Sequence, residues 1–211
     1  MSVDHVEILV EEPSMEAALR LLLPKVLAGV TFEVYPYSCK DELLGRLQQR
    51  FQGYARRRAS DPWFRDHCRI TVLVDRDEDD CHTLKEHLEK MAEDAGLVTR
   101  SCAGDGLYVV ANRIVIEELE AWYFGDWEAV RTAYPRVAGT IPSKARYCDP
   151  DAIKGGTWEA FERILQQAGY FRTGLRKIEA ARVVASHMAP DRNRSRSFQV
   201  LRELLLEMAA A

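Results

Sequence analysis

The chain has 211 residues, which is enough for one α/β domain or for a core domain with a small appendage. Hydrophobic residues make up 47% of it and charged residues 29%, a composition that excludes a disordered chain. The formal net charge of −4 argues against a protein that coats nucleic acid through a broadly basic surface, although locally concentrated basic residues could still bind a phosphate backbone.

The amino-terminal segment gives no sign of export. It lacks the apolar core and small-residue cleavage site of a secretory signal, and the apolar stretch Leu19–Val30 is interrupted by Arg20, Pro24 and Lys25. We therefore expect a cytoplasmic protein with no membrane partner. Five scattered cysteines without a CxxC pair predict reduced thiols, and not a zinc site or a redox couple.

Strands and helices are predicted to alternate over the first half of the chain. The expected strands are His5–Val10, Thr31–Tyr37, Arg69–Val74, and one or two strands over Leu107–Val110 and Ile114–Ile116. The expected helices run from the N-cap Ser14 to Val26, from Asp41 to Tyr54, and from Leu84 to Ala95. This order predicts βαβ units, and hence an α/β fold with a mostly parallel, Rossmann-like sheet between helices.

The second half of the chain is predicted to be helical. Amphipathic stretches cover Trp158–Leu165, Leu175–Met188 and Phe198–Leu205, whereas Pro135–Lys154 predicts a long irregular connection that is either functional or mobile. We therefore expect a core over residues 1–130, followed over residues 131–211 by this connection and a C-terminal helical extension packed on the core as one structural unit.

Carboxylates follow the predicted strands at the end where open parallel sheets bind ligands. They are Glu11 and Glu12 after the first strand, Asp75 and Asp77 after the third, and Glu117, Glu118 and Glu120 after the fourth. In extended backbone Asp75 and Asp77 would project to the same side, so that both could face one cation. A hard divalent ion such as Mg²⁺ prefers these oxygen ligands, and we expect such an ion to offset the repulsion between the carboxylates.

Some of these acids have simpler explanations. Asp79 and Asp80 are interpreted as caps of the helix that follows them. Glu117, Glu118 and Glu120 could equally form the acidic first turn of a helix. The five histidines show no metal-ligand spacing, and the sequence contains neither of the usual glycine-rich nucleotide-binding loops.

Two motifs resemble the Toprim domain, the catalytic module of topoisomerases, primases and certain nucleases. "ILVEEPSMEAAL" matches its first motif, with Glu11 as the Toprim glutamate, and "VLVDRDEDDC" matches its second, with Asp75 and Asp77. No tyrosine-bearing strand-passage domain or zinc-binding region accompanies these motifs, so that the resemblance favours a nuclease over a topoisomerase or a primase.

Nearly the whole chain resembles a bacterial and archaeal domain-of-unknown-function family that carries "EELEAWYFGD", "GYFRTG" and "RSFQVL". Its members resemble Toprim nucleases and are often encoded beside ATPases in phage-defence loci. By this match Glu118, Glu120 and Trp122 are expected to form or support the site. The chain departs from the family pattern at Glu12, where glycine is usual, and at Arg172, where lysine is common.

The residues and the resemblance together favour divalent-metal-dependent hydrolysis of phosphodiester bonds in DNA or RNA, with Mg²⁺ or Mn²⁺ as the cofactor. Glu11, Asp75 and Asp77 are the expected metal ligands, Glu11 is also a candidate general base, and Glu118 and Glu120 complete the expected catalytic set. Two alternatives stay open. One is a non-catalytic or conditionally active partner subunit of an ATPase complex, and the other, with less support, is nucleotide-sugar transfer.

Basic residues are candidates for contacts to nucleic acid. Arg56, Arg57 and Arg58 lie just after the second predicted helix, next to Phe51 and Tyr54, and could bind phosphates or simply form a solvated helix face. Lys154 and Arg172 are weaker candidates for the same task. The sequence indicates neither the choice between DNA and RNA nor the oligomeric state.

Overall fold

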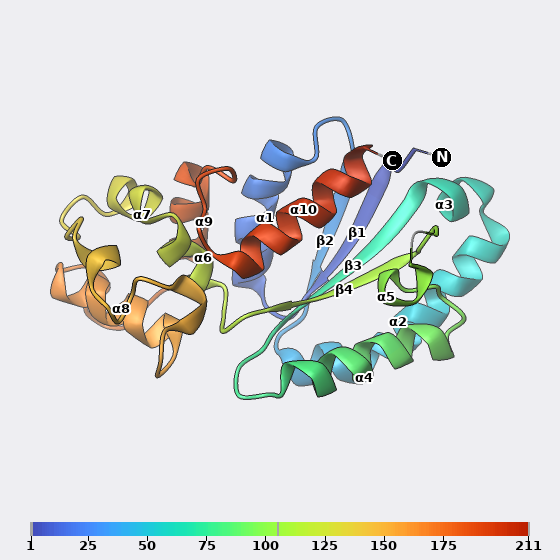
Figure 1. Cartoon of the computed structure of the whole chain (residues 1–211), viewed down its shortest axis with the longest axis horizontal. Helices are drawn as coiled ribbons and strands as arrows, with labels where there is room; N and C mark the ends of the chain where they lie inside the picture. The colour runs from blue at the N-terminus through green and yellow to red at the C-terminus, as the bar shows by residue number, and fades with distance from the viewer. Residues whose placement is uncertain (1, 105, 211) are drawn as a thin grey trace.

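Four parallel strands form one sheet within residues 2–104 and 106–210, which are the residues that this computed structural model describes (Figure 1). The strands are β1 (His5–Val10), β2 (Thr31–Pro36), β3 (Cys68–Asp75) and β4 (Val110–Val115). Their order across the sheet is β2-β1-β3-β4. Val10 is paired with Leu73, so that β1 and β3 end side by side. The predicted α/β class with a parallel sheet is confirmed.

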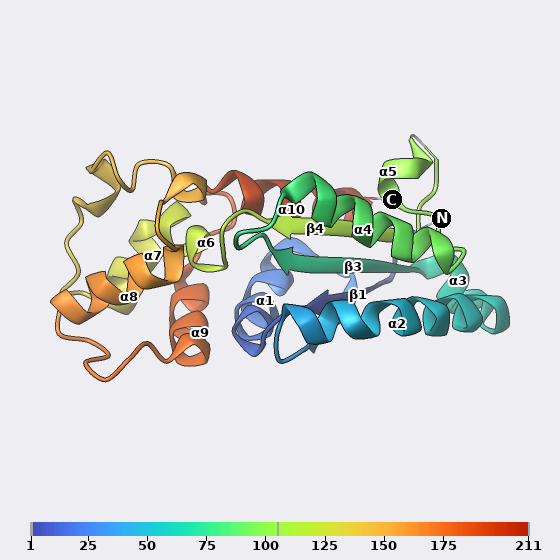
Figure 2. The ribbon, with the colours of Figure 1, turned by 90° about the horizontal axis from the view of Figure 1, so that it is seen from below.

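Helices cover both faces of the sheet, which Figure 2 shows from below. On one face lie α1 (Pro13–Val26) and α10 (Arg196–Ala210), and on the other α2 (Lys40–Ser60) and α4 (Cys81–Asp94), with the shorter helices α3 (Pro62–His67) and α5 (Arg100–Ala103) at the periphery. Alternating side chains fill two cores: Val6, Ile8 and Val10 of β1 pack toward α1, whereas Ile70, Val72 and Val74 of β3 pack toward α2 and α4.

A helical lobe lies beyond the carboxyl ends of the strands (Figure 1). Its elements are α6 (Glu120–Gly125), α7 (Trp127–Ala133), the 3₁₀ turns Ile141–Ser143 and Pro150–Ala152, α8 (Thr157–Gln167) and α9 (Lys177–His187). One hydrophobic core contains residues of β1, α1 and α9, so the C-terminal helices pack on the sheet. The helical part begins at Glu120, before the predicted boundary at residue 131.

The irregular connection between α7 and α8 is bonded to the start of α10. The Asp151 carboxylate accepts hydrogen bonds from Ser195 Oγ at 2.7 Å and from Ser197 Oγ at 3.1 Å, and a further bond from the Ser197 N–H at 3.3 Å. The first backbone N–H groups of a helix have no partner within that helix. Asp151 therefore caps α10 from a distant part of the sequence, which gives this segment of the connection a structural role.

The loop between α9 and α10 closes over the junction of α6 and α7. Asn193 Nδ2 donates to the carbonyl oxygen of Trp122 at 2.8 Å, and the Arg194 N–H donates to that of Gly125 at 3.0 Å. A Cβ atom at position 125 would lie 2.0 Å from Asn193 Oδ1, so this close approach requires glycine.

Asp126 is the charged centre of the same junction. Its carboxylate accepts hydrogen bonds from the Ala189 N–H at 2.8 Å and from Arg192 Nε at 2.8 Å, and it also caps α7 through the Ala129 N–H. The Asp126 side chain is fully buried. These contacts fix α6, the helix that carries Glu120, against the C-terminal helices.

Several predicted boundaries are wrong. Helix α1 begins at Pro13 with Glu12 as the N-cap, whereas Ser14 was expected there; Ser14 instead donates its hydroxyl to the Glu12 carboxylate. Proline is favourable at the first helical position because its fixed φ fits the helix and its missing N–H needs no partner. Helix α2 continues to Ser60 instead of ending at Tyr54.

No helix in the two described ranges has the length and apolar character needed to cross a bilayer.

Candidate functional site

Glu11 and Asp75 lie next to each other where β1 and β3 end. The Glu11 Oε2 atom accepts a hydrogen bond from the backbone N–H of Asp75 at 3.1 Å. Because β2 and β3 pair with opposite sides of β1, the chain connections diverge at this point. Ligands of open parallel sheets bind in the crevice outside the carboxyl ends of strands at such a divergence. The structure thus brings these two expected site residues together at a place suited to binding.

Asp75 is buried, with only 5% of its surface exposed. Its Oδ1 atom has no hydrogen-bond partner among the described residues. Burial, reinforced by the negative charges of Glu11, Glu12 and Glu120, raises the pKa of Asp75 well above its usual range. A buried carboxylate oxygen without a protein partner costs free energy unless a water, an ion or a ligand bonds it.

Glu11 shares this environment. Burial raises the pKa of Glu11 to about 7, although the hydrogen bond from the Asp75 N–H opposes the shift. A carboxyl group with a pKa near neutrality can exchange a proton with a ligand under physiological conditions. This is the property expected of a general base at this position.

Asp77 has a different conformation from the one predicted. Strand β3 ends at Asp75, and Asp77 has a φ of 49°, in the left-handed region, so the expectation that extended backbone would direct both aspartates to one side is wrong. Its carboxylate instead lies 2.5 Å from Lys40 Nζ. The same ammonium group lies 3.0 Å from Asp79 Oδ2, so a lysine holds the loop after β3.

Glu120 approaches the site from the helical lobe. It is 1% exposed, and its Oε2 atom finds no hydrogen-bond partner in residues 2–104 and 106–210. Burial raises the pKa of Glu120 to about 8, while the positive charge of Lys177 opposes the shift. Lys177 Nζ lies 3.5 Å from Glu12 Oε2 and 5.3 Å from the centre of the Trp158 ring. Burial lowers the pKa of Lys177, but the charges of Glu120 and Glu12 outweigh it and raise the pKa overall.

The other two glutamates after β4 have structural partners. Glu117 forms an ion pair with Arg76. Glu118 Oε2 accepts hydrogen bonds from the N–H groups of Thr157 and Trp158, both at 2.9 Å, and from Thr157 Oγ1 at 2.7 Å. Glu118 therefore caps α8 and ties it to the segment that follows β4. Of the three glutamates, Glu120 alone lies in the first turn of a helix, α6.

Sequence reasoning missed Lys40 and Lys177. Each is the first residue of a helix, α2 and α9 respectively. A cation is unfavourable there because the helix dipole places partial positive charge at the N-terminus. A lysine at the start of a helix is therefore a signal that could have identified both residues. Here the carboxylates of Asp77 and Asp79 offset the unfavourable position of Lys40, and that of Glu12 offsets the position of Lys177.

Arg56, Arg57 and Arg58 do not join this group. Lys40 is the first residue of α2 and lies beside the carboxylate site. At 1.5 Å per residue, Arg57 is about 25 Å further along the helix. Arg57 Nη1 lies 3.5 Å from Glu7 Oε1, and its guanidinium covers the Phe64 ring at 3.9 Å.

The two weaker candidates lie in the helical lobe. Lys154 is exposed and stands three residues before Thr157, in the turn that leads into α8. Arg172 is exposed in the turn between α8 and α9. Neither side chain forms an ion pair within the described ranges.

The donor set fits a hard divalent ion by its chemistry. Asp75 and Glu120 each present a buried carboxylate oxygen without a partner among the described residues. Glu11 is bonded to the Asp75 N–H, and the positive charge of Lys40 favours its ionised form. Carboxylate oxygens are the ligands that Mg²⁺ and Mn²⁺ prefer. In this structure the side chains do not form a metal-binding cluster, because no three His, Cys, Asp or Glu residues of the described ranges are positioned to hold one ion.

The pKa of Glu120 predicts a pH-dependent effect of removing its charge. Because the folded pKa of about 8 exceeds the ordinary value of 4.5, the stability gained from protonated Glu120 is complete below about pH 4.5 and is lost as the pH rises through about 8. Glu120→Gln should therefore barely change the free energy of unfolding near about pH 5, and raise it by a few kcal/mol near about pH 9.

Urea denaturation in EDTA at these pH values measures the difference. The same substitution at Glu128, whose side chain is 68% exposed, serves as the control and should give no pH-dependent difference. A stabilisation by Glu120→Gln that is equal at all pH values would contradict the burial of an ionisable carboxyl group.

The model of one protein family, DUF4276, described as a domain of unknown function, matches residues 10–208. No curated protein and no solved structure gives a significant match.

Proposed function

The chain belongs to the DUF4276 family, and we propose that it hydrolyses phosphodiester bonds of nucleic acid with the aid of a divalent metal ion, Mg²⁺ or Mn²⁺, as Toprim nucleases do. One observation carries the proposal. Glu11 and the buried, incompletely bonded Asp75 are neighbours at the carboxyl ends of β1 and β3, as the two resembling motifs imply for a Toprim site. Acidic side chains that only stabilised the fold would have no need to lie beside each other with one of them buried.

Asp75 would hold the ion, with Glu11 and Asp77 as the other candidate ligands. The ion would supply polarisation of a phosphoryl oxygen and a more acidic bound water. Asp77 is held by Lys40 in this structure, so its use as a ligand requires this ion pair to loosen.

Side chains of the protein would supply proton transfer and charge compensation. Glu11, with a pKa of about 7, suits the role of accepting the proton of the attacking water. The ammonium groups of Lys40 and Lys177 offset the negative charge of the carboxylates, which lets an anionic phosphodiester approach. Glu120 is a positioning residue, because its carboxyl group, when it is ionised, raises the pKa of both Asp75 and Lys177.

Purified protein incubated with single-stranded DNA, single-stranded RNA and supercoiled plasmid tests the proposal. We expect cleavage of at least one substrate with Mg²⁺ or Mn²⁺ and none in EDTA. Glu11→Gln should lower the rate at least about 100-fold, because it removes the proton acceptor while keeping the side-chain shape.

Glu33→Gln is the matched control. The side chain of Glu33 on β2 is 43% exposed, pairs with Arg20 and lies in the middle of the strand, so cleavage should continue at the wild-type rate. Cleavage that persists in EDTA, cleavage by Glu11→Gln at the wild-type rate, or no cleavage of any substrate would each refute the proposed function.

A further inference from the structure

A cavity of about 600 Å³ lies between the edge strand β2 and helix α2, and none of Glu11, Asp75 and Glu120 lines it. Tyr35 and Tyr37 line it from the strand side, and Arg46, Arg50 and Gly53 line it from the helix. The lining also includes Arg56 and Arg57 near the C-terminal end of α2, so the cavity is a groove that follows this helix. We call it the α2 groove.

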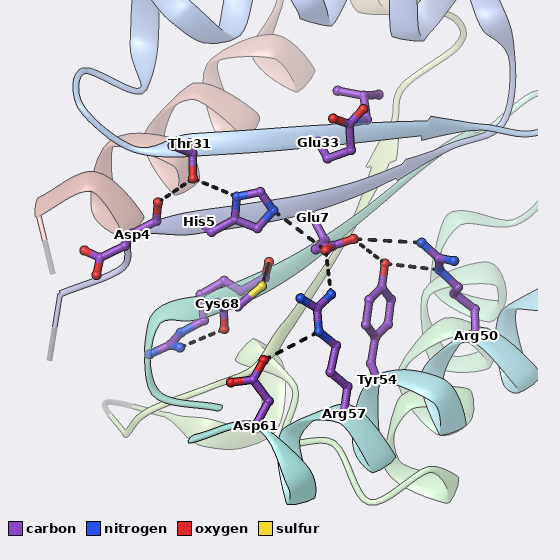
Figure 3. Close-up of polar contacts among 12 residues, drawn as sticks. Asp4, His5, Glu7, Thr31, Glu33, Arg50, Tyr54, Arg57, Asp61 and Cys68 are labelled. Atoms are coloured by element: carbon purple, nitrogen blue, oxygen red, sulfur yellow. Dashed lines mark hydrogen bonds and ion pairs between the residues drawn. The ribbon is translucent and has the colours of Figure 1, made fainter. Parts of the chain in front are cut away.

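The interior of the α2 groove is a fixed polar network (Figure 3). Glu7, 3% exposed, accepts a hydrogen bond from the Tyr54 hydroxyl at 2.9 Å. Arg57 Nη1 lies 3.5 Å from the same carboxylate, and Arg50 Nη2 lies 3.8 Å from it. Burial raises the pKa of Glu7, but its hydrogen bonds with His5, Tyr54 and Tyr35 outweigh burial, so the pKa is lowered and the carboxylate is charged. This buried charge anchors the arginines.

Arg50 is further held between two aromatic rings. Its guanidinium carbon lies 4.4 Å from the centre of the Tyr35 ring and 5.0 Å from that of Tyr54. Contact with ring faces and with Glu7 reduces the entropy that the side chain would lose on binding a ligand. The arginine is therefore positioned before any ligand arrives.

The charge of the α2 groove is opposite to that of the whole chain. Arg46, Arg50, Arg56 and Arg57 line it, and Glu7 is the one carboxylate among the lining residues, in a protein whose formal net charge is −4. Outside the lining, Glu42 lies 3.0 Å from Arg46 and Asp61 lies 3.9 Å from Arg57. A local concentration of arginines against an acidic background favours an anionic ligand, and guanidinium groups match phosphate oxygens in geometry. Half-buried Tyr37 adds an aromatic surface on which a planar ring can stack.

Gly53 keeps the groove open. Glycine inside a helix costs about 1 kcal/mol relative to alanine, and here a Cβ atom would meet no other atom within 4 Å. Packing within the chain therefore gives no reason for the missing side chain.

The α2 groove leads toward the carboxylate site. The Tyr37 N–H donates to the carbonyl oxygen of Val10 at 2.9 Å, one residue before Glu11, and α2 starts with Lys40, which contacts Asp77. From Arg46 to Arg57 the helix rises about 16 Å. At a stacked spacing of about 3.4 Å per nucleotide, this length accommodates about five nucleotides of one strand.

From these features we propose that the α2 groove binds single-stranded nucleic acid, with phosphates on the arginines and a base against Tyr37. A single strand offers both groups at once, whereas the base faces of a duplex are covered by stacking. That this strand is the substrate, led along α2 toward Glu11 and Asp75, rests on the proposed function. The binding of a single strand in the α2 groove does not depend on the proposed function.

Fluorescence anisotropy in EDTA tests the binding without cleavage. The probe is a labelled single strand of about 12 nucleotides, roughly twice the length that the groove holds, as DNA and as RNA, beside the corresponding duplex. We expect the single strand to bind at least about 10-fold more tightly than the duplex, with affinity that falls as salt is added.

Gly53→Leu and Gly45→Leu form a matched pair. Both glycines lie inside α2, and a Cβ atom added at either would have no atom within 4 Å, so both substitutions should favour the helix, but Gly53 alone lines the groove. Gly53→Leu should weaken binding of the single strand at least about 10-fold, whereas Gly45→Leu should bind as the wild type does.

Three outcomes overturn the proposal: equal binding by the two leucine variants, equal binding of single strand and duplex, or equal binding of a mononucleotide and the strand. The two proposals fail separately. A wild type that binds the strand in EDTA but never cleaves it refutes the proposed function alone. If the wild type cleaves with Mg²⁺ and the Gly53→Leu variant binds and cleaves as well as the wild type does, only the proposed binding in the α2 groove is refuted.

Discussion

Replacing Asp75 by asparagine is expected to abolish cleavage of nucleic acid and at the same time to raise the free energy of unfolding. Asparagine keeps the size of the side chain but removes a charge that burial and the neighbouring carboxylates disfavour. The rate of cleavage should fall at least about 100-fold. The free energy of unfolding near about pH 8, measured by urea denaturation in EDTA, should rise by roughly 1 to 3 kcal/mol.

Asp80→Ala is the control from the same acidic segment, and it should behave in the opposite way. Asp80 caps α4 by accepting hydrogen bonds from the Thr83 N–H at 2.9 Å and from Thr83 Oγ1 at 3.0 Å. Its loss should lower the free energy of unfolding by about 1 kcal/mol and leave cleavage intact. If Asp75→Asn instead loses stability, or cleaves at the wild-type rate, the buried aspartate serves the fold and not the reaction.

Asp126→Ala should cause the largest loss of stability among the substitutions considered, about 2 to 4 kcal/mol. The variant leaves the Ala189 N–H without its partner, removes the cap of α7 and deprives Arg192 of a carboxylate that binds it through Nε and Nη2 at 2.8 and 3.1 Å. The loss stays below that of a fully buried pair because the Arg192 side chain is 40% exposed. Urea denaturation measures it directly.

Glu128→Ala provides the comparison, since Glu128 contacts the same arginine. Its Oε2 lies 2.9 Å from Arg192 Nη1, but its side chain is 68% exposed, and exposed ion pairs contribute at most about 1 kcal/mol. We expect the free energy of unfolding to change by less than about 0.5 kcal/mol. Equal losses in the two variants would show that the ion pair itself, and not the burial of Asp126, fixes the junction of α6 and α7.

The two central strands could be predicted from the sequence because burial dominates both β1 and β3. All eight residues of β3 are buried, and most of them are apolar, with Arg69 and Thr71 as the interruptions before the strand closes on Asp75. Strand β4 was harder to locate, because Asn112 and Arg113 interrupt its apolar pattern. The structure resolves the conflict: Asn112 is buried and donates to Glu89 Oε1 at 2.9 Å, a contact that sequence periodicity does not reveal.

The helices were predicted where an apolar stripe marks them and missed elsewhere. The last turns of α2, from residue 55 to residue 60, carry mostly polar side chains, so periodicity ends before the helix does. Helix α3 is only six residues long, too short for a periodic signal, and is started by Asp61 as the N-cap and Pro62.

The site was only partly predictable for a related reason. Glu11 and Asp75 could be identified because each follows a strand, and the ends of parallel strands meet by geometry. Lys40 and Lys177 come from the starts of two helices whose relative placement depends on tertiary packing. The conformation of Asp77 depends on the loop after β3, whose course the sequence pattern does not fix.

The close contact at the junction of α6 and α7 constrains how this chain can vary. Because the space beside Gly125 is filled by the Asn193 side chain and the Ser195 N–H, a larger residue at position 125 can be accommodated only if the segment around position 193 changes with it. Positions 125 and 193, far apart in sequence, should therefore co-vary among relatives, either both conserved or both replaced. A library that randomises one of them alone should return almost no folded protein with a larger residue there, whereas joint randomisation should recover new pairs.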